Sequence, residues 1–146
     1  MNCSHVVLER ACLIVGIEAE GARLLRIGSN TVYRLAVPVI VRISRPGADV
    51  EHARRTVAVA RWLESINYPA VRVIDVDQPV VLDGHTITFW EAVSDDGDQY
   101  ATVGEVAEVL VKLHKLVAPT DLHLPKLERF EDAAKRIPDQ HLAYAW

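Results

Sequence analysis

The residues best suited to chemistry lie between positions 24 and 44, in the stretch LLRIGSNTVYRLAVPVIVRIS. Small and turn-forming residues occupy four consecutive positions there: Gly28, Ser29, Asn30 and Thr31. Such a turn lets backbone N–H groups approach phosphate oxygens closely, and its hydroxyl and amide side chains add donors. Arg42 follows inside a run of β-branched residues, where a cation is costly unless an anion compensates it. Because a planar guanidinium suits phosphate, the turn and the arginine together predict a phosphate-binding site.

Each of these two features has a simpler interpretation when it is taken alone. A Gly-Ser-Asn turn usually joins two strands of a hairpin and binds no ligand. A strand arginine more often lies at a sheet edge, where its head group reaches water. The choice between the interpretations depends on the elements that surround the two features.

Strand and turn signals fill the first two thirds of the chain. β-branched residues predict strands over 22–27, 31–37, 39–44 and 70–76. Pro38 predicts a tight reversal between the second and third of them, because proline cannot donate a hydrogen bond to a ladder. Asp83 and Gly84 form a strong turn signal, which predicts a hairpin over 79–93.

Helices are predicted before, between and after the strands. The spacing of apolar residues predicts helices over 5–15, 49–66, 102–116 and 126–137. Asp49 is expected to cap the second helix, and Thr102 with Glu105 forms a capping box for the third. The residues expected to face inward are Val7 or Leu8, Ala11 and Val15 in the first helix, Val50, Ala53, Val57, Ala60 and Leu63 in the second, and Val106, Val109, Leu110 and Leu113 in the third.

Composition favours a cytoplasmic protein that binds neither nucleic acid nor membrane. Half of the 146 residues are hydrophobic, enough for a packed core, and the net charge of -4 argues against a nucleic-acid or anionic-membrane partner. No apolar run approaches the roughly 20 residues that span a bilayer, and the N-terminus lacks the basic region of a signal peptide. Two scattered cysteines suit a reducing compartment.

The order of the elements predicts an α+β architecture in two parts. Strands gathered ahead of helices indicate a sheet-containing lobe over 1–93, a linker over 94–101 in the acidic segment SDDGDQ, and the beginning of a helical lobe over 102–146. Two or three helices are few to close a second core. We therefore expect an incomplete helical lobe, and either a homo-oligomer formed through its apolar faces or docking of the C-terminal tail back onto the sheet.

The run from about Leu8 to about Leu116 resembles the N-terminal lobe of the aminoglycoside phosphotransferase family, the small-molecule relatives of protein kinases. The resemblance implies a kinase-like lobe with a five-stranded antiparallel sheet and one long helix. It also implies that the 28–31 turn lies over the nucleotide phosphates, that Arg42 reaches the α- and β-phosphates, and that TITFWEAV (86–93) is the fifth strand and hinge. The nucleotide-binding residues implied in this way are Gly28, Ser29, Asn30, Thr31, Arg42, Trp90, Glu91 and Val93.

Two features depart from the pattern of that family. Thr56 occupies the position of a helix glutamate that pairs with the strand-three cation, so Arg42 is expected to be held by phosphate or by a carboxylate from elsewhere. The His-Gly-Asp motif of the family's catalytic loop occurs nowhere in the sequence. We therefore assign no catalytic residue and no metal ligand, and expect Mg²⁺ only together with the missing C-terminal lobe.

The function implied by the resemblance is ATP or GTP binding in a phosphotransferase that transfers the γ-phosphoryl group to the hydroxyl of a small, cationic substrate. The chain alone is expected to be inactive. Two alternatives stay open: a stand-alone, degenerate nucleotide-binding or regulatory module, and a structural domain that self-associates. The sequence does not identify the phosphoryl acceptor.

Overall fold

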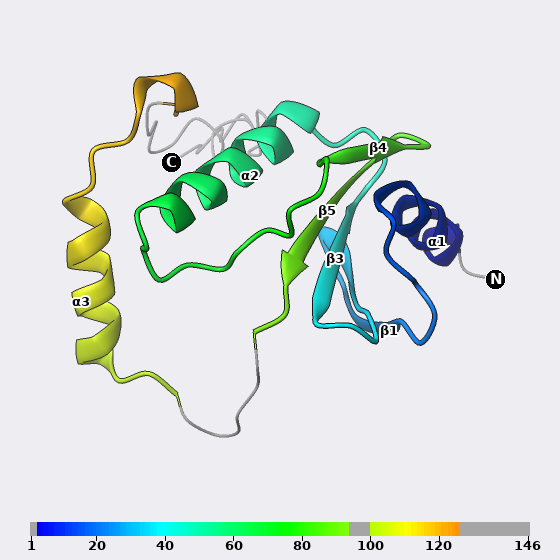
Figure 1. The fold of residues 1–146 in the computed structure, drawn as a ribbon, viewed down its shortest axis with the longest axis horizontal. Helices are drawn as coiled ribbons and strands as arrows, with labels where there is room; N and C mark the ends of the chain where they lie inside the picture. Colours follow the sequence, from blue (N-terminus) through cyan, green and yellow to red (C-terminus); the bar gives the residue numbers. More distant parts are fainter. Residues whose placement is uncertain (1–2, 94–99, 126–146) are drawn as a thin grey trace, which may run out of the picture.

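The computed structural model describes residues 3–93 and 100–125. Figure 1 shows its elements, which are α1 (Cys3–Val15), β1 (Arg23–Ile27), β2 (Asn30–Arg34), β3 (Val39–Ser44), α2 (Val50–Ser65), β4 (Val80–Leu82), β5 (His85–Glu91), α3 (Val103–His114) and the 3-10 helix η1 (Thr120–Leu122). The predicted helix over 126–137 and most of the predicted linker over 94–101 lie outside the described residues.

A five-stranded sheet forms the centre of the structure. Its strand order is β1-β2-β3-β5-β4, and every neighbouring pair is antiparallel. Helices α1 and α2 lie on opposite sides of this sheet, as Figure 1 shows. The predicted α+β fold class, a kinase-like lobe with a five-stranded antiparallel sheet and one long helix, is confirmed.

The two faces of the sheet differ because successive strand residues point to opposite sides. In β3, the buried residues Val39, Val41 and Ile43 belong to the core cluster that contains α1. Ile40 and Arg42 alternate with them and face α2 and the cavities beneath the sheet. The β-branched run around Arg42 therefore builds the core with one face, and the other face is available to a ligand.

Helix α1 closes the core on one side of the sheet. As predicted, it buries Val7, Leu8 and Ala11, and it ends at Gly16, whose φ of +73° is a left-handed conformation that glycine adopts without strain. Cys12 is also fully buried against the sheet, and this burial raises the pKa of its thiol to about 11. The thiol of Cys12 is therefore protonated and unreactive at neutral pH.

Helix α2 covers part of the other face. The Asp49 side chain accepts a hydrogen bond of 2.9 Å from the Glu51 N–H, which confirms the predicted cap. Val57 and Ala60, from the middle of the predicted stripe, are buried in a second cluster with Val73 and Trp90. The helix is thereby fixed over the end of β5 that leads to the predicted hinge.

The predicted strand over 70–76 is wrong. This segment makes one isolated bridge, between Val73 and Trp90, and the fourth strand of the sheet is β4 instead. The reason lies in Gln78, whose side-chain amide accepts from the Phe89 N–H at 2.8 Å and donates to the Phe89 carbonyl at 3.3 Å. At the Phe89 N–H a side chain thus takes the place of a backbone acceptor. Backbone pairing of this segment with β5 is limited to the Ile74 N–H donating to the Phe89 carbonyl at 3.1 Å and the Glu91 N–H donating to the Arg72 carbonyl at 2.9 Å. The predicted hairpin around Asp83 and Gly84 is confirmed, with φ of +51° and +78° at its turn.

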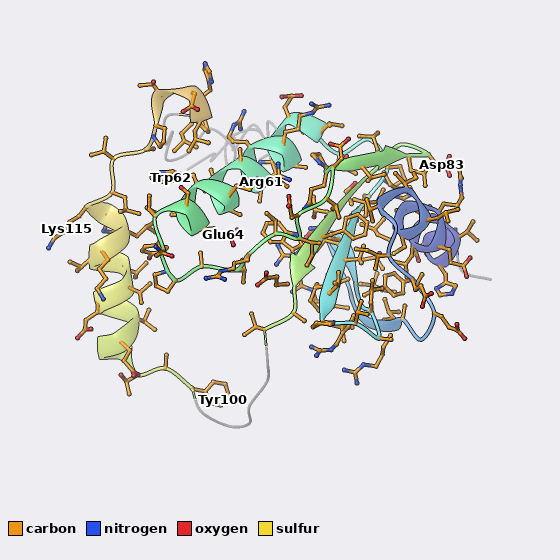
Figure 2. All side chains as sticks on the ribbon, in the orientation of Figure 1. Arg61, Trp62, Glu64, Asp83, Tyr100 and Lys115 are labelled. Carbon is orange, nitrogen blue, oxygen red and sulfur yellow. The ribbon has the colours of Figure 1, made fainter. Side chains whose placement is uncertain are left out.

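Helix α3 begins with the predicted capping box of Thr102 and Glu105, but its apolar residues do not face inward as predicted. Val106, Leu110 and Leu113 are exposed, and Val109 alone of the predicted four is half-buried. Within the described part of the chain, α3 stands apart from the sheet in Figures 1 and 2. The Tyr68 hydroxyl donates a hydrogen bond of 2.9 Å to the Val109 carbonyl and links this helix to the lobe. An apolar stripe indicates which face a helix would bury, but not whether a partner surface is present.

None of the described helices is both long enough and apolar enough to cross a membrane.

Candidate functional site

A groove of about 750 Å³ runs beneath the sheet beside the end of β5. Part of its wall is apolar and consists of Leu25, Ile40, Val71 and Val93. The remaining wall carries charge, from Arg23, Arg34, Arg42 and Glu91. Apolar walls suit a flat aromatic base, and several cations in one groove suit a polyanion, so the groove combines the two requirements of a nucleotide.

Arg42 occupies the centre of this region. In the sheet, Arg42 lies opposite Val32 of β2 and Thr88 of β5. Its Cζ lies 4.6 Å from the centroid of the Trp90 ring. Among the described residues, no carboxylate lies within ion-pair distance of the guanidinium. Burial, and secondarily the charge of Arg26, lower the pKa of Arg42 from its usual value. The cation is therefore incompletely compensated, and an anion at this place would be bound favourably.

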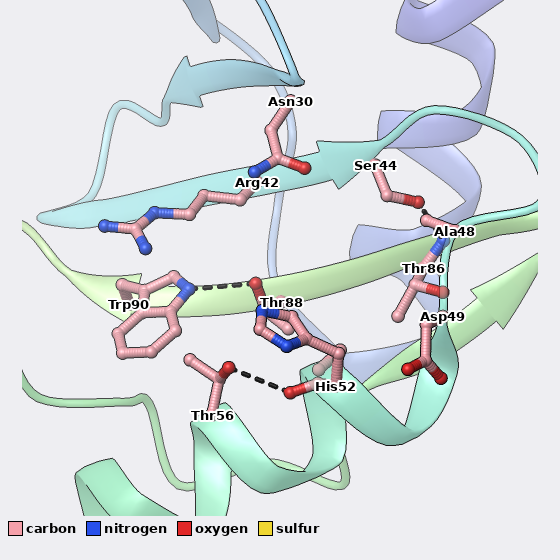
Figure 3. A pocket seen from close by; sticks show the side chains of 11 residues that line it. Asn30, Arg42, Ser44, Ala48, Asp49, His52, Thr56, Thr86, Thr88 and Trp90 are labelled. Atoms are coloured by element: carbon pink, nitrogen blue, oxygen red, sulfur yellow. Dashed lines mark hydrogen bonds between the residues drawn. The ribbon is translucent and has the colours of Figure 1, made fainter. Parts of the chain in front are cut away.

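A second, smaller cavity of about 240 Å³ separates the sheet from α2 (Figure 3). Arg42 and Trp90 line it from the sheet, and His52 and Thr56 line it from the helix. The Thr56 hydroxyl donates to the backbone carbonyl of His52 at 2.8 Å. Position 56 therefore lines the same cavity as the cation, but it brings a hydroxyl that is already bonded to its own helix.

Only one residue of the predicted 28–31 turn, Asn30, lines a cavity together with Arg42. Gly28 and Ser29 join β1 to β2, and the Gly28 N–H donates to the Asn30 carbonyl at 3.0 Å. Asn30 and Arg42 line a cavity of about 380 Å³ together with Arg26. Gly28, Ser29 and Thr31 line none of the three cavities that contain Arg42. The structure thus brings Asn30 and Arg42 to one place, with the rest of the turn beside them.

The predicted hinge residues Trp90, Glu91 and Val93 all line the groove. Trp90 is 3% exposed, whereas Val93 is 67% exposed and lines the groove. The Glu91 N–H donates to the Arg72 carbonyl and the Ala92 N–H donates to the Pro38 carbonyl, at 2.9 and 2.8 Å. In the described part of the chain, the Val93 N–H makes no backbone hydrogen bond.

Several residues that line the groove or the cavity of about 380 Å³ were not predicted from the sequence: Arg23, Leu25, Arg26, Arg34 and Ile40. Ile40 had a readable signal, because it lies two residues before Arg42 in one strand and must share its face. The β1 residues had none, because the pairing register shifts between Leu24 and Arg26 and interrupts the alternation of faces. Arg23 and Arg34 lie directly opposite each other across β1 and β2, which only the register reveals.

The sequence matches a known protein family. The model of the phosphotransferase enzyme family matches residues 22–145, which is most of the chain. The chain belongs to this family. The resemblance to aminoglycoside phosphotransferases is thereby confirmed, and the chemistry of the phosphotransferase family is kinase-like phosphoryl transfer, which in general uses a nucleotide such as ATP. No curated protein matches the chain.

Proposed function

We propose that the described lobe binds ATP, or a similar nucleoside triphosphate, in the groove that Arg42 shares with the hinge. The observation that carries this proposal is the guanidinium of Arg42, which has no carboxylate partner among the described residues and lies in a groove with an apolar wall. In this proposal Arg42 binds the α- and β-phosphates, and Asn30 and the 28–31 turn contribute further donors. The Val93 N–H binds the edge of the base.

The charges in the groove support a polyanionic ligand. Arg23, Arg34 and Arg42 line it with Glu91 as the one acidic residue, although the whole chain has a net charge of -4. Arg26 adds a further cation beside Asn30. A concentration of cations on an otherwise acidic protein attracts a nucleoside triphosphate and raises its association rate.

The reaction that we propose for the complete protein is transfer of the γ-phosphoryl group to a hydroxyl of a small molecule. This step needs a base near the acceptor hydroxyl and ligands for the magnesium ion that neutralises the phosphates. The described residues form no group of three or more His, Cys, Asp or Glu side chains that could hold a metal, and the sequence contains no His-Gly-Asp motif. We therefore assign nucleotide binding, and not the transfer step, to these residues.

Thermal unfolding with and without nucleotide tests the proposal. A ligand at about 100 times its Kd stabilises the folded state by about 2.7 kcal/mol, which raises Tm by several degrees for a chain of this size. We expect such a shift with MgATP or MgGTP, and a smaller one with magnesium tripolyphosphate, which lacks the base. If neither nucleotide at millimolar concentration raises Tm above the Mg²⁺ control, the nucleotide-site proposal is wrong.

Removing one of the facing arginines of β1 and β2 should change the stability of the free protein and its affinity for nucleotide in opposite directions. Like charges directly opposite each other destabilise an antiparallel pair, and Arg23 and Arg34 are such a pair. Arg34→Gln should therefore leave the stability of the free protein equal or raise it by about 0.5 kcal/mol. The same change should weaken MgATP binding a few-fold and reduce its salt dependence, because one cation is removed from the groove.

Arg54→Gln is the matched control for Arg34→Gln. Arg54 lies on the exposed side of α2, where its Nε is 3.3 Å from a Glu51 carboxylate oxygen, and it lines none of the cavities that contain Arg42. Its loss changes the net charge equally and should leave nucleotide affinity unchanged. Equal weakening by both variants would mean that the overall charge, and not the groove, attracts the nucleotide.

A further inference from the structure

The indole of Trp90 lies beneath the guanidinium of Arg42, as Figure 3 shows. Arg42 is opposite Thr88 in the β3–β5 ladder, and Trp90 is two residues further along β5 on the same face. This diagonal relation is within reach of long and aromatic side chains. The 4.6 Å between Cζ and the ring centroid lies well inside the range of a cation–π interaction.

Trp90 is itself held firmly. Its Nε1–H donates to the Thr88 hydroxyl oxygen at 2.9 Å, so the ring is tied to the strand from which it projects. Val57 and Ala60 of α2 pack in the same buried cluster, together with Val73. A ring fixed by packing and by a hydrogen bond presents its face to Arg42 in one orientation.

The acidic residues of the neighbouring helix are engaged elsewhere. Glu51 pairs with Arg54 on the helix surface, and Glu64 pairs with Arg72 at 3.8 Å. The Asp49 side chain caps the helix by accepting a hydrogen bond from the backbone N–H of Glu51. With Thr56 bonded to a backbone carbonyl, α2 offers Arg42 no carboxylate, and the face of Trp90 is the attractive group that the structure places against the guanidinium.

We propose that Trp90 is the positioning residue of Arg42: its indole face holds the guanidinium in the groove, where a carboxylate from α2 would otherwise hold it. The arrangement differs from an ion pair in one functional respect. A carboxylate neutralises the cation, whereas an aromatic face orients it and leaves its N–H groups free for phosphate. The consequence for nucleotide binding depends on the function proposed above, but the stacking itself does not.

Replacement of Trp90 tests the positioning role through its dependence on Arg42. Trp90→Leu removes the aromatic face and should weaken MgATP binding about threefold to thirtyfold, whereas Trp90→Phe, which keeps a weaker face, should weaken it less. In an Arg42→Gln background, Trp90→Leu should cause no further loss, because the group that it positions is gone. Adding Thr56→Glu to Trp90→Leu should recover most of the lost affinity, because a carboxylate from α2 can then hold Arg42.

Phe89→Leu is the control for a general loss of stability. Phe89 precedes Trp90 and is completely buried, but it belongs to the core on the α1 face. This variant should lower Tm and leave the MgATP affinity unchanged. Two outcomes overturn the proposal: Trp90→Leu causes as large a loss of affinity in the Arg42→Gln background as in the wild type, or Thr56→Glu does not recover the lost affinity. Either outcome would mean that Trp90 contacts the nucleotide directly or serves only the fold.

A measurement without nucleotide separates this proposal from the proposed function. In an NMR spectrum of the wild-type protein, the ring current of Trp90 should shift the Arg42 Nε–H resonance upfield. This shift should disappear in Trp90→Leu. If that variant does not fold, the shift should change in Trp90→Phe. If MgATP does not bind but the shift is present, the proposed function fails and the stacking stands. An unshifted Arg42 resonance in the wild type overturns the positioning role whether or not nucleotide binds.

Discussion

Arg42→Ala is expected to remove most of the stabilisation that MgATP gives to the lobe. Hydrogen bonds to a charged group contribute about 2 kcal/mol, so loss of the guanidinium should weaken binding about thirtyfold. At a concentration of about 100 times the wild-type Kd, the stabilisation then falls from about 2.7 to about 0.9 kcal/mol. Differential scanning fluorimetry over a nucleotide titration measures both values.

The free protein should respond differently to the same substitution. Arg42 has no ion-pair partner among the described residues, so its removal leaves no buried carboxylate uncompensated. The main loss is its contact with Trp90, and the Tm of the free variant should stay within a few degrees of the wild-type value. Arg54→Ala removes the same charge at a residue that lines none of the cavities containing Arg42, and should retain the full nucleotide response. If Arg42→Ala melts far lower without nucleotide and the wild type gains nothing from it, Arg42 is a structural residue.

Gln78→Leu is expected to lower the free energy of unfolding by about 3 kcal/mol, because it leaves the Phe89 N–H without an acceptor and removes two further hydrogen bonds to backbone carbonyls. Gln78 is 8% exposed, and its amide bonds to both the N–H and the carbonyl of Phe89 and, at 2.7 Å, to the carbonyl of Ile74. Leucine fills a similar volume and restores none of these bonds. The Phe89 N–H in particular loses its acceptor. Urea-induced unfolding followed by circular dichroism measures the change.

Thr86→Val is the matched contrast to Gln78→Leu. Thr86 is also buried on β5, but its hydroxyl oxygen has no hydrogen-bond partner among the described residues. Valine has nearly the same shape, so this variant should be neutral or slightly more stable. Equal destabilisation by the two variants would mean that steric fit, and not hydrogen bonding, makes this strand sensitive to substitution.

The features that the sequence predicted well are those that neighbouring residues decide. Asp83 and Gly84 predict their turn because both adopt the positive φ that a two-residue hairpin requires. Asp49 and Thr102 predict helix starts because a side-chain oxygen can accept from N–H groups two or three residues ahead. The predictions that failed, the strand over 70–76 and the inward face of α3, each needed a partner that is distant in the sequence.

For the candidate site, the sequence by itself determined which residues could do chemistry: a small-residue turn at 28–31, a cation at Arg42 and the missing carboxylate at Thr56. Only the tertiary structure decided what these residues meet. It placed Arg42 over Trp90, set Arg23 opposite Arg34 and, among the described residues, gave the Val93 N–H no backbone partner. The physical reason is that contacts across a sheet depend on strand order and register, and a bulge such as that in β1 changes them without a signal at the residues concerned.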